Sequence, residues 1–304
     1  MTIQTGNTMN IHKIVSPRLF NVLLIRVLGK MSLNNISGTS ALYNMMKGFQ
    51  LLRAGFVLSW PSIIKHSTNP DKITNVSTIL DTADGIFEMG RYEECYNILI
   101  NSKNEKDIEV KWRLCRALYN MAKDSKYDEQ YRKDIIFQAF EIIAPELEQN
   151  WDHFAVHKWY ALTLDAKSSN IGIREKIKQL ENVKKHMDLA VTLNPNDASL
   201  LHMLGEWSFQ VTELPWHQRK TIETLIARIP YSTYEDALEY FLRAEAAQPR
   251  FYSMNLLRIG YCYLKLNKCD QAKYYLKLAA SYPAKSNNDH QANKEAVELL
   301  RTLK

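Results

Sequence analysis

Near the end of the chain, large apolar residues recur every three or four positions, the spacing of one face of an α-helix. Two such stretches follow each other; the first carries a glycine, the second an alanine, and a proline comes after them: Leu256, Ile259, Gly260 and Tyr263, then Ala272, Leu276 and Pro283. The small residues allow two helices to approach closely, and proline does not fit a helix interior. The pattern therefore predicts an antiparallel helix pair that ends before Pro283.

The same order of residues follows the tetratricopeptide pattern, W-x2-L-G-x2-Y and then A-x3-F and P. A helix pair of this kind buries its apolar face only against neighbouring pairs, so further copies are expected. An earlier copy carries Gly205, Ala237 and Phe241, and weaker copies begin near residues 80, 112 and 159. Strand patterns are scarce after residue 70. We predict an all-α fold: a tetratricopeptide-like solenoid of about five antiparallel helix pairs, closed by a capping helix over 291–303.

Two connections within pairs are expected to be long. The glycine-to-alanine spacing is 12 residues in the last copy but 32 in the copy over 198–249, which predicts an insertion of 20 residues. Pro215 and Pro230 bracket a short amphipathic helix there, and we expect it to cover an edge of the solenoid or to fill its concave groove. A second long loop is predicted around 167–172.

The first seventy residues differ in charge from the rest. They contain no Asp or Glu before Asp71, whereas seven basic residues lie among them: Lys13, Arg18, Arg26, Lys30, Lys47, Arg53 and Lys65. The net charge of +6 therefore resides in this segment, and the remainder, 71–304, is near neutral. The composition is that of a mitochondrial targeting segment. A disordered basic arm is the other interpretation, and both stay open.

Membrane and redox features are weak. Residues 49–64 are mostly apolar but include Arg53 and Pro61, and they are shorter than the roughly 20 residues of a membrane span. Membrane contact is therefore expected only through the N-terminal segment, if anywhere. The four cysteines have no C-x2-C spacing and are expected to be reduced.

A search for catalytic and metal motifs yields no constellation. His153 and His157 stand four residues apart on one predicted helix face, but Phe154 follows where the H-E-x2-H motif requires Glu, and no third ligand is evident. Phosphate-binding glycine loops are not present in the sequence. We therefore expect no catalytic residue, no metal and no cofactor, and no nucleic-acid partner because no recognition motif accompanies the charge.

A basic helix face is the main candidate for contact with a partner. Within 173–191, apolar residues at helical spacing predict the buried side. The candidate face comprises Arg174, Lys178, Lys184 and Lys185. Such a face attracts an acidic surface in a salt-dependent way, although a simply solvated helix face is the alternative.

Four segments together resemble the regulator of microtubule dynamics family over residues 75–303: His157–Ala161, Leu193–Ala198, Pro215–Arg219 and Ser232–Leu238. The insertion residues Pro215, Trp216, Gln218 and Arg219 are the most specific part of this likeness. The chain looks most like the shorter, unanchored branch of the family.

The resemblance implies a non-enzymatic binding or scaffold protein that associates with microtubules and the spindle and has a role in chromosome segregation. The cytoplasm and the spindle are its expected locations. The alternative is a mitochondrial or membrane-contact repeat protein that holds a protein or a lipid in its concave groove.

Overall fold

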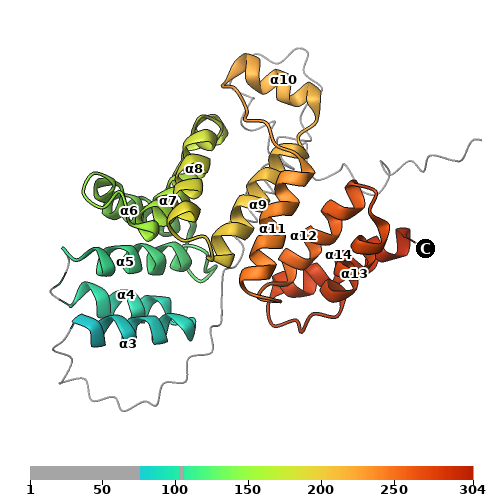
Figure 1. The fold of residues 1–304 in the computed structure, drawn as a ribbon. Coiled ribbons are helices and arrows are strands. Elements are labelled where there is room, and N and C mark those ends of the chain that lie inside the picture. Colours follow the sequence, from blue (N-terminus) through green and yellow to red (C-terminus); the bar gives the residue numbers. More distant parts are fainter. Residues whose placement is uncertain (1–75, 103, 105, 304) are drawn as a thin grey trace, which may run out of the picture.

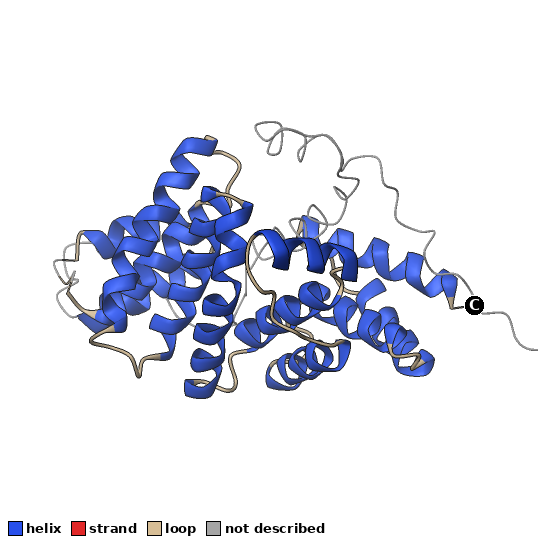
Figure 2. Cartoon of the chain, turned by 90° about the horizontal axis from the view of Figure 1, so that it is seen from above, coloured by secondary structure: helices blue, strands red, loops and turns tan. Residues whose placement is uncertain are grey.

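The computed structural model describes residues 76–303 except 103 and 105. In this part of the chain every regular element is a helix, as Figures 1 and 2 show. The predicted all-α class is thus confirmed. The basic segment over 1–70 lies outside the described residues.

Five helix pairs follow one another along the chain. They are α3 (Val76–Glu88) with α4 (Tyr92–Ile100), α5 (Ile108–Met121) with α6 (Glu129–Ile143), α7 (Phe154–Ile171) with α8 (Ile173–Leu193), α9 (Ala198–Thr212) with α11 (Tyr234–Ala247), and α12 (Ser253–Lys265) with α13 (Cys269–Ala280). A short 3₁₀ helix, η3 (Ala144–Leu147), follows α6. The inserted helix is α10 (Trp216–Leu225), and α14 (Asn287–Thr302) packs on α12 and α13 as the cap.

Side-chain caps fix where several helices begin. Asp107, Asp128 and Asp197 each accept a backbone N–H at the start of α5, α6 and α9. Capping boxes start α11 at Thr233 and α14 at Ser286. The capping helix therefore begins one turn earlier than the sequence pattern predicted.

The long loop predicted around 167–172 is wrong. Residues 167–171 continue α7, and only Gly172, at φ 143°, separates it from α8. Polar groups beside this junction have partners within the pair: Ser169 donates to the Asp165 carbonyl, and Lys176 of α8 forms a buried ion pair with the Asp165 carboxylate at 3.2 Å.

The two glycines of the repeat pattern lie where paired helices touch. A Cβ on Gly205 would stand 2.5 Å from the Phe241 ring, and one on Gly260 would stand 2.7 Å from the Leu276 side chain. Ala237 and Ala272 are also fully buried, while Tyr263 is partly exposed and its ring stacks on Tyr275. Glycine at 205 and 260 thus permits the close approach of α9 to α11 and of α12 to α13.

The array bends between α8 and α9. The first helices of the early pairs stack directly, α3 on α5 and α5 on α7. The next first helix, α9, packs mainly on α8. Apolar residues of α8 and α9, including Met187 and Trp207, still belong to one continuous core. Figure 1 shows the consequence: α3 to α8 form one side of the molecule and α9 to α14 the other.

Candidate functional site

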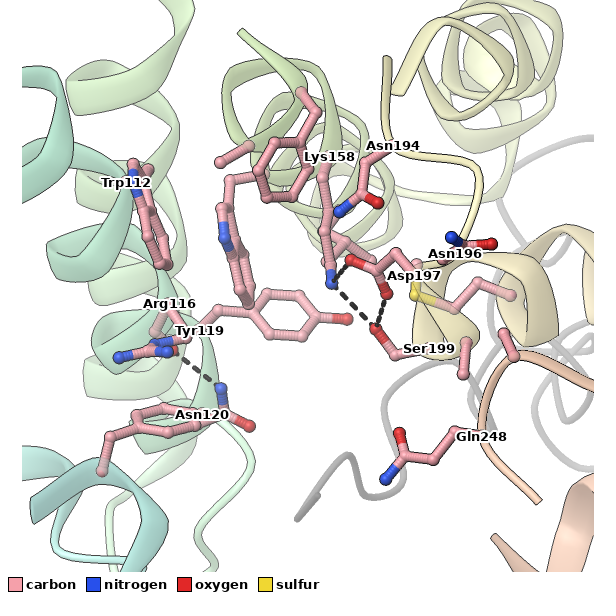
Figure 3. Close-up of a pocket in the computed structure, with 18 of the residues that line it drawn as sticks. Trp112, Arg116, Tyr119, Asn120, Lys158, Asn194, Asn196, Asp197, Ser199 and Gln248 are labelled. Atoms are coloured by element: carbon pink, nitrogen blue, oxygen red, sulfur yellow. Dashed lines mark hydrogen bonds and ion pairs between the residues drawn. The ribbon is translucent and has the colours of Figure 1, made fainter. Parts of the chain in front are cut away.

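A pocket of about 670 Å³ lies between the two sides of the molecule. Its wall comes from α5 and its following turn, from α7, from the start of α9 and the loop before it, and from the end of α11. In Figure 3, Trp112, Arg116 and Asn120 of α5 stand on one side, and Lys158 and Asp197 on the other. The bend thus opens a large cavity between helices of different pairs.

Aromatic and basic groups alternate on the α5 wall. The Arg116 guanidinium lies 3.9 Å from the centre of the Phe87 ring and 5.1 Å from that of Trp112. Arg116 also bonds to the Asp84 carboxylate, which accepts a further hydrogen bond of 2.8 Å from Arg113. These contacts hold the guanidinium in place beside the pocket.

The opposite corner is an ion pair at a helix start. Lys158 Nζ of α7 donates to Asp197 Oδ2 at 2.6 Å and to Ser199 Oγ at 2.8 Å. Asp197 also caps α9 by accepting the Leu200 N–H at 3.0 Å. Burial favours the neutral carboxyl, but Lys158 and these donors outweigh it and hold the pKa of Asp197 below its ordinary value. The corner is therefore charged and fully paired.

Lys123 is an unpaired cation of the pocket. It follows α5, and its Nζ has neither solvent contact nor a hydrogen-bond partner among the described residues. The nearest interaction is with the Tyr119 ring, whose centre lies 4.3 Å away. Burial lowers the pKa of Lys123 to about 7, because no carboxylate compensates the lost hydration. A buried amine without a partner is unusual, and it marks this pocket as a candidate binding site.

The predicted basic face lies elsewhere, on α8. Arg174, Lys178 and Lys185 are exposed and share one side of the helix with the exposed Glu181. Lys184 differs from them: it is half-buried and donates to Asp188 at 2.6 Å. The structure therefore brings three of the four predicted residues to one solvent-facing row.

The two histidines at metal-binding spacing turn to different partners. His153 Nε2 lies 2.9 Å from Glu109 Oε1, whereas His157 Nδ1 lies 2.8 Å from His186 Nδ1. Within residues 76–303, apart from the two undescribed positions, no three His, Cys, Asp or Glu side chains lie close enough to share a metal ion. Both histidines serve helix packing in α5, α7 and α8.

Comparison with known proteins decides the family. The family described as "Regulator of microtubule dynamics protein 1-3" matches residues 79–304. The chain belongs to this family. It is 40% identical to regulator of microtubule dynamics protein 1 of Bos taurus over 230 residues, which are 76% of this chain and 73% of that one. The corresponding protein of Mus musculus is 39% identical over 79% of each chain.

The third member of the family is a more distant relative. Regulator of microtubule dynamics protein 3 of Mus musculus is 31% identical over 74% of this chain but only 48% of its own length. This comparison agrees with the assignment to the shorter branch. The crystal structure of a thermophilic tetratricopeptide-repeat protein from Thermus thermophilus has a TM-score of 0.50, 14% identity, and covers 73% of this chain and 98% of that one. It confirms the tetratricopeptide-like fold.

The insertion residues on which the family likeness was based fold as a separate projection. Arg219 donates to the carbonyls of Val211, Ile229 and Pro230, all at 2.9–3.1 Å, and thus ties both ends of the insertion together. Ile222 and Gln218 are buried, but Trp216 beside the exposed Pro215 is 76% exposed. No α10 residue lines the pocket, so of the two expected positions, an edge of the solenoid or its groove, the helix does not take the groove. The helix covers the outer end of the α9–α11 pair instead.

Sequence reasoning missed the pocket. Arg116 and Lys123 belong to the α5–α6 pair, Lys158 to the α7–α8 pair and Asp197 to the start of α9, so only tertiary packing brings them around one pocket. The motif Asn194-Pro195-Asn196-Asp197 was a usable signal, because Asn-Pro and Asp before an apolar run indicate a turn and a helix cap. Among the described helices, none has the length and apolarity that crossing a membrane requires.

Proposed function

We propose that this chain is a non-enzymatic helical-repeat scaffold that associates with microtubules and the spindle and influences microtubule dynamics. Family membership supports the cytoskeletal role, because the relatives are named for the regulation of microtubule dynamics. The fold supports a binding role, since stacked helix pairs present long surfaces to partners. Cytoplasm and spindle are the matching locations.

The row of exposed basic side chains on α8 is the main support for the proposed contact surface. Arg174 and Lys185 have no ion pair among the described residues, and Lys178 has only a distant one, 3.9 Å from Glu175. Unpaired surface charges remain available to an acidic partner, whereas a paired charge such as that of Lys184 is already compensated. The proposed microtubule contact is therefore the row Arg174, Lys178 and Lys185.

Charge reversal tests this contact. The triple variant Arg174→Glu, Lys178→Glu and Lys185→Glu should reduce microtubule co-sedimentation of the full chain about tenfold or more, because attraction becomes repulsion. Binding of the unaltered protein should weaken as salt is raised from about 50 to 200 mM. The measurement is the fraction pelleted over a microtubule titration.

The matched control reverses another exposed cationic pair, Lys273 and Lys277 of α13. Lys273→Glu with Lys277→Glu should leave pelleting within about twofold of the unaltered chain. Equal losses in both variants would show attraction to any positive surface. Unchanged pelleting of the α8 variant would refute the row as the contact.

The second candidate function is that of a mitochondrial or membrane-contact repeat protein with a partner in its concave pocket. The pocket with its unpaired Lys123 favours this candidate. It predicts that the protein from cells fractionates with mitochondria and that the α8 variant behaves as the unaltered chain there. Fractionation with microtubules alone would count against it.

A further inference from the structure

We propose that the inserted segment over 215–231 docks on an anionic phospholipid membrane, with Trp216, Leu225 and Tyr231 entering the interface and Lys220 and Arg228 facing the headgroups. The segment shares no residue with the pocket lining or with the basic row on α8. The inference therefore goes beyond the proposed microtubule contact. It also uses no residue of 1–70, the segment in which the sequence predicted membrane contact.

The insertion exposes more apolar surface than its own folding requires. Ile222 and Ile229, each 2% exposed, anchor the segment in the core. Tyr231 and Trp216, in contrast, are the most exposed large apolar side chains of the described residues, at 83% and 76%, and Leu225 is 60% exposed. Single exposed apolar side chains are ordinary, whereas three on one short segment indicate a contact surface.

The segment projects from the molecule. Figure 1 shows α10 beyond the ends of α9 and α11, and α10 makes no extended contact with any other described helix. Trp216 and Lys220 lie one turn apart on the same side of α10, and Leu225 ends the helix about 15 Å further along. Arg219 holds both ends of the insertion, so these side chains stand on a tethered support. A projection of this kind enters a broad surface without needing a cavity in its partner.

The uncompensated charges of the segment are positive. Its one acidic side chain, Glu223, lies 3.7 Å from Arg219 and also accepts the Ile229 N–H. Lys220 and Arg228 are exposed, and no ion pair joins either to another described residue. Anionic lipids attract such free cations at a membrane surface.

The residue types favour a membrane over a protein partner. Trp and Tyr prefer the boundary between headgroups and acyl chains, because each has an apolar ring and a polar group that stays hydrated. A stable protein interface buries about 800 Å² of each partner, more than these three side chains offer together. A membrane sets no such requirement, since each side chain enters the interface separately.

Vesicle co-sedimentation of the full chain tests the apolar part of the contact. The probe is a large unilamellar vesicle of phosphatidylcholine with about 30% phosphatidylserine, compared with phosphatidylcholine alone. Trp216→Ala with Leu225→Ala should weaken binding about tenfold, because two side chains no longer enter the interface. The matched control is Trp151→Ala with Leu193→Ala, the same residue types at exposed positions outside the insertion, and it should leave binding unchanged.

Neutral substitutions test the charged part. Lys220→Gln with Arg228→Gln should weaken binding to the phosphatidylserine vesicles several-fold and reduce its sensitivity to salt. Lys273→Gln with Lys277→Gln, an exposed pair on α13, is the matched control and should have no effect. A thermal melt of each variant shows that it is folded.

A spectroscopic readout separates this contact from any attraction by the basic residues over 1–70, which are the same in all variants. Phosphatidylcholine brominated on its acyl chains quenches tryptophan fluorescence only at short range. Vesicles that contain it should quench Trp216→Phe less than the unaltered chain, and Trp151→Phe as much as the unaltered chain. Equal quenching in the two phenylalanine variants would overturn the proposal, whatever the total binding.

Microtubule pelleting distinguishes a membrane from a protein partner. The Trp216–Leu225 variant should pellet with microtubules as the unaltered chain does, so failure of this proposal and failure of the α8 contact are separate results. Weaker pelleting of this variant, with unchanged vesicle binding, would overturn the membrane contact and assign the segment to a protein surface.

Discussion

At the scale of single residues, the repeat pattern identified the close contacts but not the charges. The role of Gly205 and Gly260 could be predicted from the sequence, because a close approach of two paired helices leaves no room for a Cβ. This requirement is local to one helix pair. The buried, unpaired state of the Lys123 amine could not be predicted from the sequence, because it depends on which groups of other helices lie within hydrogen-bond distance. A lysine in a turn after a helix ordinarily indicates only a solvated surface.

Replacement of Gly205 by alanine should destabilise the fold. The new Cβ would lie 2.5 Å from the Phe241 ring, which is itself fully buried and has little room to move. Overpacking of this kind costs about 1–3 kcal/mol. Urea unfolding followed by circular dichroism measures the loss.

Gly85→Ala is the control for the same chemical change. Gly85 lies within α3, and a Cβ there would meet nothing within 4 Å. Alanine favours the helix over glycine by roughly 0.5–1 kcal/mol, so this variant should be slightly more stable. A loss of stability in both variants would show that the contact with Phe241 does not govern position 205.

At the scale of elements, the sequence predicted the helix pairs well, since proline, small residues and apolar spacing are local signals. The loop around 167–172 was predicted wrongly. In the structure Ser169 bonds to the Asp165 carbonyl within α7, and Lys176 of α8 pairs with the Asp165 carboxylate. The inserted helix was predicted between its prolines, but two positions stayed open, an edge of the solenoid or its groove, because the local pattern does not specify which neighbour the helix contacts.

Arg219 should control the order of the inserted segment. Its three bonds reach carbonyls at both ends of the insertion, which would lose their donors in Arg219→Met. We expect limited trypsin digestion to cleave after Lys220 or Arg228 several-fold faster in this variant, through local opening. Lys220→Met, at an exposed neighbour, is the control and should remove one site without hastening cleavage at Arg228. Equal cleavage at Arg228 in all three proteins would mean that the arginine does not hold the segment.

At the scale of the whole molecule, the bend between α8 and α9 decides where the pocket lies. No local pattern encodes it, because it results from α9 packing mainly on α8 rather than on α7. The pocket is thus a product of tertiary structure, whereas the exposed row on α8 follows from the spacing of residues along one helix.

The ion pair of Lys158 with Asp197 joins the two sides of the molecule across this bend. Lys158→Met leaves the buried Asp197 carboxylate without its cation, which should cost about 3–5 kcal/mol of unfolding free energy. Because the pKa of Asp197 is depressed in the fold, its contribution is present above the unfolded value near 4 and is lost as pH falls further. The difference between variant and unaltered chain should therefore shrink below about pH 4.

Lys167→Met is the control, since Lys167 pairs with Glu141, whose side chain is 72% exposed. Such a surface pair contributes about 0–1 kcal/mol. Chemical unfolding at about pH 7 and about pH 3 compares both variants above and below the pKa of an aspartate in the unfolded chain. Similar losses of unfolding free energy from the two substitutions would show that the pair across the bend stabilises the fold no more than a surface pair does.

The inserted helix also has a practical consequence for experimenters. The segment leaves and rejoins the α9–α11 pair at neighbouring points held by Arg219, and Tyr231 near its return is 83% exposed. Chain added there lengthens a loop that is already closed, so the entropic cost grows only with the logarithm of its length. The loop at Tyr231 is therefore a suitable place for a fluorescent tag or an affinity epitope in work on the pocket, because it lies outside the lining of the pocket.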